Sequence, residues 1–276
     1  MNRYKKINTS ELQSILLEGL LEIHRVCEKH DLSYWLDSGT LLGAIRNGTF
    51  IPWDDDIDIC MPREDFNRFI SCSYDELDSN KYFLQTPKTD KFYKDFDIPC
   101  KLKINNTLLI ESNKTSTLSK KPHQGFFIDI FPCDQYPTDK LTRKMYQSIY
   151  FLYHGKSLFY RKNISKKALI ASHLIHYTIP IKLLNWLTSK VCNRLNKNKN
   201  NTIISKGVEL PFHKGNIPKD NIFPLSKIYL SGYAFYSPNN SHEYLKSLYG
   251  INYMTPPPLD QQISHSSEFY IDIHNK

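Results

Sequence analysis

Ile51-Pro52-Trp53-Asp54-Asp55-Asp56-Ile57-Asp58-Ile59 is the stretch that decides how this chain is interpreted. Its end alternates Asp with Ile, which is the two-residue period of a β-strand with one buried face. Asp56 and Asp58 are therefore expected on one face, about 7 Å apart at a rise of about 3.3 Å per residue. Two neighbouring carboxylates repel each other unless a cation lies between them, and Mg²⁺ prefers oxygen ligands. The alternative is an acidic turn that faces water.

A third carboxylate lies inside the apolar segment 123–132, HQGFFIDIFP, which predicts a short buried strand closed by Pro132. Burying an unpaired carboxylate is costly, so such a group is paired, protonated or bound to metal. Asp129 facing Asp56 and Asp58 would give the arrangement used in two-metal phosphoryl and nucleotidyl transfer. These three residues are the predicted catalytic and metal-binding set. A structural ion pair with a lysine or arginine is the alternative for Asp129.

A Gly-Thr turn precedes the acidic run. Residues 34–36 read as a strand and residues 40–46 as the first turns of a helix, with Gly39 and Thr40 at the junction. Such a junction exposes backbone N–H groups and the positive end of the helix dipole, which together bind phosphate. Further candidate phosphate contacts are basic residues, with solvated surface charge as the alternative: Arg46, Lys101 and Lys103.

Several motifs resemble those of the LicD family of bacterial phosphocholine transferases, which is related to the animal fukutin-type ribitol-phosphate transferases. The motifs that carry the resemblance are DSGTLLGAIR at 37–46, FIPWDDDID at 50–58, FIDIFP at 127–132, and the closing FPL at 223–225, GY at 232–233, PNN at 238–240 and YGINYM at 249–254. The resemblance covers most of the chain, and the middle, 138–206, matches only loosely.

The resemblance implies a nucleotidyltransferase-like fold and Mg²⁺-dependent (or Mn²⁺-dependent) transfer of a phosphorylated alcohol. The implied donor is CDP-choline or another CDP-alcohol. The implied acceptor is a hydroxyl of a cell-surface glycan in lipopolysaccharide, capsule or teichoic acid, assembled on a lipid carrier, and CMP is released. Transfer from CDP-ribitol or CDP-glycerol is the first alternative, and true nucleotidyl transfer to a sugar or small molecule is the second. A non-catalytic protein that binds an acidic polymer or a membrane is a third class.

Composition is consistent with a cytoplasmic enzyme. The 276 residues carry a net charge of +8, with basic residues scattered or placed in the mid-chain helices, so no nucleic acid partner is expected. No apolar segment of a secretory signal follows Met1–Lys6. The six cysteines lack metal-site spacing and are expected to be reduced.

The pattern along the chain predicts an α+β fold, with a mixed β-sheet, flanking helices and one catalytic unit over 1–276. Its parts are a nucleotidyltransferase-like core (1–135), a helical region (136–200) and a loop-rich C-terminal segment that completes the site (201–276). Further strands are expected at 82–86, 98–104 and 107–111, the last two joined as a hairpin through Asn105-Asn106. Ser10 is expected to cap the first helix, with Gln13 as its capping-box partner.

Residues 168–181 carry no formal charge and are too short to span a bilayer, which needs about 20 residues. A buried helix is expected, with a helix on an anionic membrane surface as the alternative, since lysines and arginines over 161–199 make peripheral contact plausible. Aromatic side chains are candidates for holding a quaternary ammonium, although core packing is the expected role of most of them: Trp35, Trp53, Tyr93, Phe96 and Phe126.

Overall fold

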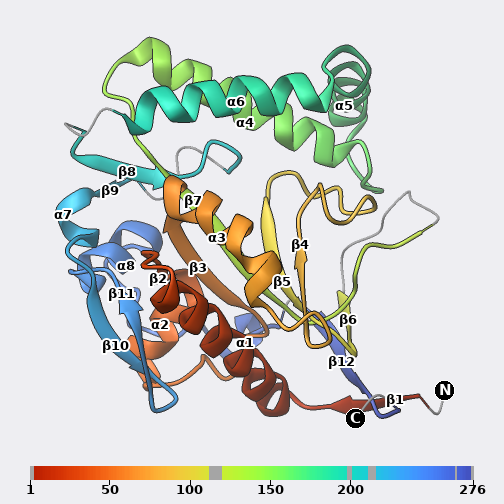
Figure 1. Cartoon of the computed structure of the whole chain (residues 1–276), viewed down its shortest axis with the longest axis vertical. Helices are drawn as coiled ribbons and strands as arrows, with labels where there is room; N and C mark the ends of the chain where they lie inside the picture. The colour runs from red at the N-terminus through yellow and green to blue at the C-terminus, as the bar shows by residue number, and fades with distance from the viewer. Residues whose placement is uncertain (1–2, 112–119, 198–200, 211–215, 265, 275–276) are drawn as a thin grey trace.

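A seven-stranded mixed β-sheet forms the centre of the structure (Figure 1). The computed structural model describes residues 3–111, 120–197, 201–210, 216–264 and 266–274. Strands β3 and β7 run parallel, whereas the other pairs of this sheet are antiparallel. The strands in spatial order are β2 (Trp35–Leu36), β3 (Ile57–Pro62), β7 (Phe127–Gln135), β5 (Cys100–Ile104) and β4 (Tyr82–Gln85), with β8 (Ile203–Lys206) also paired to β7 and β9 (Ile217–Pro218) to β8.

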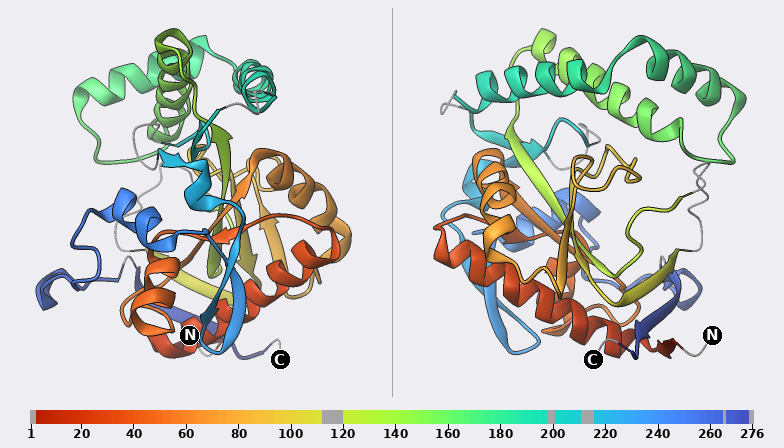
Figure 2. Two further views of the ribbon diagram at one scale, coloured as in Figure 1. Left: turned by 90° about the vertical axis from the view of Figure 1, so that its left-hand side faces the viewer. Right: turned by 45° about the vertical axis from the view of Figure 1, so that its right-hand side comes forward.

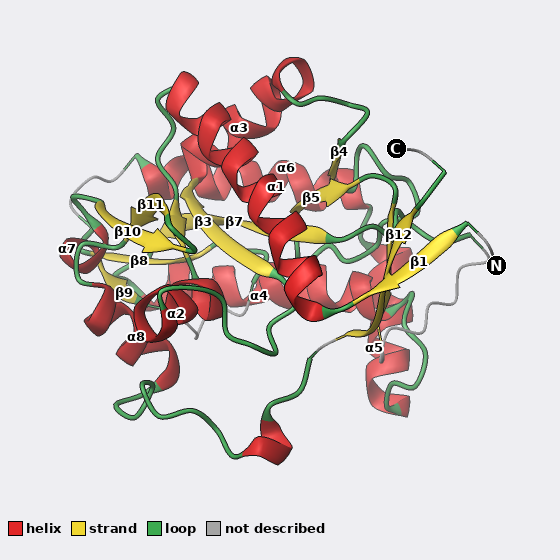
Figure 3. Ribbon diagram, turned by 90° about the horizontal axis from the view of Figure 1, so that it is seen from below, coloured by secondary structure: helices red, strands yellow, loops and turns green. Residues whose placement is uncertain are grey.

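Two helices, α1 (Thr9–Lys29) and α3 (Arg63–Glu76), cover one face of this sheet (Figure 3). A side chain added at Gly19 of α1 would lie 3.1 Å from the Cδ1 atom of Ile128, so Ile128 points toward this helix. Side chains alternate along a strand, so Asp129 and its neighbours Phe127 and Phe131 point toward the opposite face. One face of β7 is therefore core, and the other is available for a site.

Smaller elements surround the sheet. Helix α2 (Ser38–Asn47) links β2 to the acidic run before β3, and α7 (Lys219–Ile222) and α8 (Ser241–Tyr249) lie in the C-terminal segment. The remaining strands form two separate sheets: β1 (Tyr4–Ile7), β12 (Ser266–Asp272) and β6 (Thr107–Glu111) in one, and β10 (Ser226–Leu230) with β11 (Tyr233–Ser237) in the other.

The middle of the chain forms a layer of helices at one end of the sheet, as Figure 2 shows from two sides. The helices are α4 (Lys140–Leu158), α5 (Lys166–Thr178) and α6 (Ile181–Asn196), and Pro180 is the N-cap of α6. Residues 198–200 of the expected helical region lie outside the described residues. Among the helices within the described ranges, none is both long and apolar enough to cross a membrane.

The α+β fold class is confirmed, but the expected hairpin at Asn105-Asn106 is wrong. Both edges of β5 are already occupied, one by β4 and the other by β7. Strand β6 therefore cannot pair with β5 and joins β12 in the other sheet. The expected strand end at Pro132 is also wrong, because β7 continues to Gln135 and pairs there with β8.

The N-cap of the first helix lies two residues earlier than expected. Asn8 is the N-cap: its side chain accepts a hydrogen bond from the Glu11 N–H at 2.9 Å, and the Glu11 side chain accepts one from the Asn8 N–H. Gln13 has another role, because its side-chain amide donates to the carbonyl oxygens of Ile51 and Asp54 at 3.0 and 2.9 Å. It thus anchors the acidic run to α1.

The expectation of a buried helix over 168–181 is also wrong. Ser172 is the buried residue of α5, whose large apolar side chains are mostly exposed. Helix α5 packs against α4 on one side, and the core of the helical layer is formed by α4 with α6, through Tyr146, Tyr153 and Leu184. The other side of α5 therefore faces outward.

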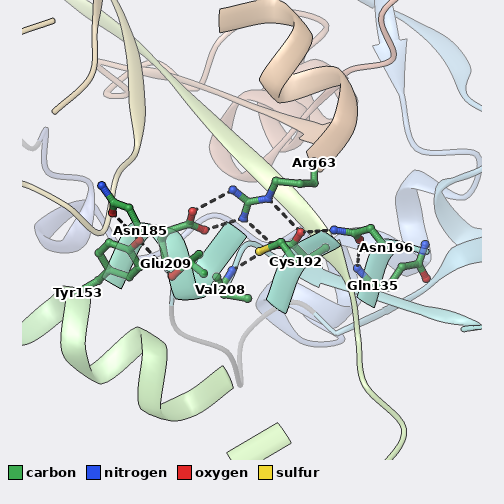
Figure 4. Close-up of polar contacts among 10 residues, drawn as sticks. Arg63, Gln135, Tyr153, Asn185, Cys192, Asn196, Val208 and Glu209 are labelled. Carbon is green, nitrogen blue, oxygen red and sulfur yellow. Dashed lines mark hydrogen bonds and ion pairs between the residues drawn. The ribbon is translucent and has the colours of Figure 1, made fainter. Parts of the chain in front are cut away.

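A buried ion-pair network joins the helical layer to the central sheet (Figure 4). The Arg63 guanidinium donates to both carboxylate oxygens of Asp134 at 3.0 and 2.6 Å, and to both of Glu209 at 2.9 and 2.7 Å. Asn196 of α6 donates to Asp134 at 2.7 Å and accepts from the Gln135 N–H at 2.9 Å. Burial alone would raise the pKa of Asp134, but the Arg63 charge lowers it.

Replacing Arg63 by Met should lower the free energy of unfolding by about 3–5 kcal/mol, because two buried carboxylates would lose their cation. The matched control is Arg25→Met, which removes an exposed pair with Glu22 and should cost at most about 1 kcal/mol. Urea unfolding of the three proteins measures both changes. Equal effects of the two substitutions would contradict the structural role given to Arg63.

Candidate active site

Charged side chains form a row across three adjacent strands. Asp58 on β3 is the register partner of Asp129 on β7, which in turn is the partner of Lys101 on β5. Register partners on neighbouring strands point to the same face, about 4.8 Å apart. The Lys101 Nζ atom lies 2.5 Å from Asp129 Oδ1, and both side chains are almost fully buried. Asp129 therefore lies beside Asp58 and also forms the ion pair that was its structural alternative.

The acidic run before β3 brings further carboxylates to this place. Oxygen atoms of Asp54, Asp55 and Asp56 lie within 4.8 Å of one another. The expected alternation is present, since Ile57 and Ile59 are fully buried while Asp56 and Asp58 are half-buried. The run is thus a group of carboxylates at the start of a buried strand.

These carboxylates repel one another strongly. Burial, then the charges of Asp58 and Asp55, raise the pKa of Asp54 to about 7. Burial and the charge of Asp54 raise the pKa of Asp56, and burial and the charge of Asp56 raise that of Asp58. Asp129 adds to the repulsion on both. A divalent cation would relieve this repulsion, and a set of oxygen ligands is the one that Mg²⁺ or Mn²⁺ takes.

A second charged group lies beside the row and was missed by the sequence reasoning. Lys206 of β8 places its Nζ atom 2.5 Å from Asp37, which is fully buried and also accepts a hydrogen bond from the Tyr244 hydroxyl at 2.6 Å. Burial would lower the pKa of Lys206, but the charge of Asp37, and further that of Asp58, raise it. A lone lysine in the apolar stretch 203–208 is the signal that could have identified it.

The predicted phosphate-binding turn lies at the start of α2, next to the carboxylates. A side chain at Gly39 would approach the Asp54 Oδ2 atom to 2.6 Å, so this position has no room for one. The Thr40 hydroxyl accepts a hydrogen bond from the Asp58 N–H at 2.9 Å, which joins α2 to β3. The side chain of Asp37, the N-cap of α2, accepts a hydrogen bond from the Ser38 hydroxyl at 3.0 Å but no capping hydrogen bond from a backbone N–H of the helix. Phosphate binding by Gly39 and Thr40 stays a prediction.

The basic residues predicted to contact phosphate lie in different places. Arg46 is in the last turn of α2, at the far end from Gly39, and donates to the Tyr253 carbonyl oxygen at 2.8 Å. Lys101 is held by Asp129, and Lys103 donates to the Gly125 carbonyl oxygen at 3.0 Å. Both lysines lie over the ring of Phe127. The structure thus brings Lys101 to the carboxylates and places Arg46 away from them.

Most of the aromatic candidates belong to the core. Trp35 and Phe126 are fully buried, and Tyr93 and Phe96 nearly so. Trp53 is partly buried and packs against the core that contains Trp35 and Phe126, whereas Phe96 belongs to the core of the helical layer. The expectation of ordinary core packing for most of them is therefore confirmed.

The substitution Gly39→Ala should lower the affinity for Mn²⁺ by about 10-fold or more, because the new methyl group must displace the Asp54 carboxylate. The change in helix propensity should not lower the thermal stability, since Ala is more favourable than Gly in a helix by up to about 1 kcal/mol. Asn47→Ala, at the exposed end of the same helix, is the control. Calorimetric titration measures the affinities, and equal affinity in the two variants would contradict this geometry.

Comparison with known proteins agrees with the motifs. The sequence model of the family described as LicD/FKTN/FKRP, nucleotidyltransferase domain, matches residues 31–182. The chain is 30% identical over 283 residues to the lipopolysaccharide cholinephosphotransferase LicD of Haemophilus influenzae, covering 97% of this chain and 99% of that protein. It is 50% identical over 40 residues to the ribitol 5-phosphate transferase FKRP of human and mouse, covering 14% of this chain and 8% of those proteins.

A likeness to the solved structure of the antibiotic-resistance factor ANT(2'')-Ia covers 68% of this chain and 94% of that chain, but its TM-score of 0.26 at 10% identity supports no conclusion. The family model covers more than half of the chain, and the match to the Haemophilus protein extends over nearly all of it. This chain therefore belongs to the LicD family and is a phosphotransferase enzyme.

Proposed function

We propose that this enzyme transfers phosphocholine from CDP-choline to a hydroxyl of a cell-surface glycan and releases CMP. The observation that carries the proposal is the row Asp58–Asp129–Lys101 beside the carboxylates of Asp54 and Asp56, where the Asp54 charge raises the pKa of Asp56. The near full-length match to a lipopolysaccharide cholinephosphotransferase favours choline as the head group and such a glycan as the acceptor. We propose that the reaction takes place in the cytoplasm, because CDP-activated donors are made there.

Mg²⁺, or Mn²⁺ in its place, would be held by Asp56 and Asp58, with Asp54 and Asp129 as further oxygen ligands. The donor set fits such an ion, because it consists of carboxylates that repel one another, and a divalent cation bound among them would relieve that repulsion. When bound, the ion supplies stabilisation of the charge that develops on the pyrophosphate.

The chain's own groups bind and orient the reactants. The start of α2 lies next to Asp54 at Gly39, and the backbone N–H groups of a helix N-terminus suit the donor phosphates. The acceptor oxygen attacks the distal phosphorus, the bond from this phosphorus to the CMP oxygen breaks, and the acceptor proton goes to a base. We assign that role to the Oδ2 atom of Asp129, since Lys101 holds Oδ1. A purely metal-binding Asp129 is the other assignment.

Two other reactions use the same carboxylates. Transfer of ribitol phosphate or glycerol phosphate from a CDP-linked donor also releases CMP, and a ribitol 5-phosphate transferase is among the relatives. Nucleotidyl transfer instead attacks the α-phosphorus and leaves the nucleotide on the acceptor. Incubation with CDP-choline, CDP-ribitol and CDP-glycerol, Mg²⁺ and cell-surface glycan separates the three by the product that carries the phosphorus.

The substitution Asp56→Asn or Asp58→Asn should reduce the rate of CMP release at least about 10²-fold. Losses of this size are found when groups that stabilise a transition state electrostatically are removed. The control Asp75→Asn, exposed on α3, should leave the rate unchanged. Far-ultraviolet circular dichroism checks that the variants remain folded. A rate near that of the unchanged enzyme in either active-site variant would contradict the metal-site assignment.

A further inference from the structure

Charge is strongly segregated along this chain. Between Asp139 and Glu209 the sequence contains 14 lysines and arginines and no Asp or Glu. The rest of the chain has 22 lysines and arginines, 36 less these 14, against all 28 acidic residues. The segment between Asp139 and Glu209, most of which forms the helical layer, therefore carries the whole positive excess, and the remainder of the protein is acidic.

The same layer exposes apolar side chains in two stripes. Helix α5 presents Ile170, Leu174 and Tyr177 to solvent, with exposed fractions of 71%, 64% and 75%. Helix α6 presents Leu183, Trp186 and Leu187. The spacings of three and four residues place each set on one side of its helix. These outward stripes are the reverse of the core stripe expected of a helix that is covered by protein.

Exposed cations continue both stripes. Lys166 and Lys167 lie one turn before Ile170, and Lys190 lies one turn after Trp186, whose ring it approaches to 5.9 Å. An apolar face with Trp and Tyr, bordered by lysines, is typical of helices that lie in the membrane interface.

We propose that the stripes of α5 and α6 dock the enzyme on the surface of an anionic lipid bilayer, as a peripheral contact. The apolar side chains would enter the boundary between headgroups and acyl chains, while the lysines contact anionic headgroups. The positive charge of α5 and α6 favours an anionic bilayer over a second copy of this chain, because a second copy would bring two positive faces together. A free polyanion would use the lysines and leave the apolar stripes exposed.

Sedimentation with vesicles of phosphatidylglycerol and phosphatidylcholine tests the proposal without any assay of catalysis. Binding should be clear at low salt, fall at high salt and be absent with phosphatidylcholine alone, because the charges are screened over about 8 Å at physiological ionic strength. Lys166→Gln with Lys167→Gln should weaken binding at least about 10-fold, from about 1 kcal/mol of attraction per charge. No sedimentation with the anionic vesicles at low salt would overturn the proposal.

The stripes are tested separately from the charges. Ile170→Ser with Leu174→Ser should also weaken vesicle binding, while Leu259→Ser, exposed outside the helical layer, should not. Vesicles should shift the fluorescence of Trp186 to the blue, since Trp35 is buried and Trp53 partly so, and Trp186→Phe should remove the shift. Unchanged binding in the stripe variant would overturn the proposal, and so would a dimer in light scattering that the stripe variant converts to a monomer.

Discussion

Repulsion among the carboxylates at the start of β3 is the constraint on which the rest of this structure depends. Asp54, Asp56 and Asp58 are brought together at the edge of a core, where each raises the pKa of its neighbour. Opposite charge nearby stabilises the ionised form of such a group. The protein supplies part of it through Lys101, which holds Asp129, and Lys206, which holds Asp37. A bound cation is the component that would supply the rest.

The two faces of the central sheet differ because the carboxylates need opposite charge beside them. Its isoleucines, such as Ile128, meet the helices of one face, and the alternate positions carry the charged row. Elements distant in sequence hold the acidic run in place. The Gln13 amide of α1 donates hydrogen bonds to carbonyl oxygens of the run, and the Thr40 hydroxyl of α2 accepts one from the Asp58 N–H. The Arg63 network then connects this catalytic layer to the helices, through carboxylates on β7 and in the C-terminal segment.

The local pattern of this sequence was enough to predict the α+β class, the strand at Ile57–Ile59 and the carboxylate of Asp129 in an apolar strand. These features depend on the alternation of side chains along a strand, which is visible in one segment. Pairing between segments is not visible in this way. The hairpin at Asn105-Asn106 failed because β5 already had two neighbours, and Lys206 was missed because only the folded chain brings β8 to Asp37. Burial of residues 168–181 was predicted from their lack of charge, but nothing within the described residues covers the outer side of α5.

The central claim is that the carboxylates before and within β3 hold a divalent cation. Crystals of the enzyme soaked with Mn²⁺ test it most directly, because Mn²⁺ is located by its anomalous scattering without assumptions about activity. We expect an anomalous peak bounded by carboxylate oxygens of Asp54, Asp56 and Asp58, with oxygen–metal distances near 2 Å. The absence of an anomalous peak among these three residues, at a high Mn²⁺ concentration, would contradict a cation site there.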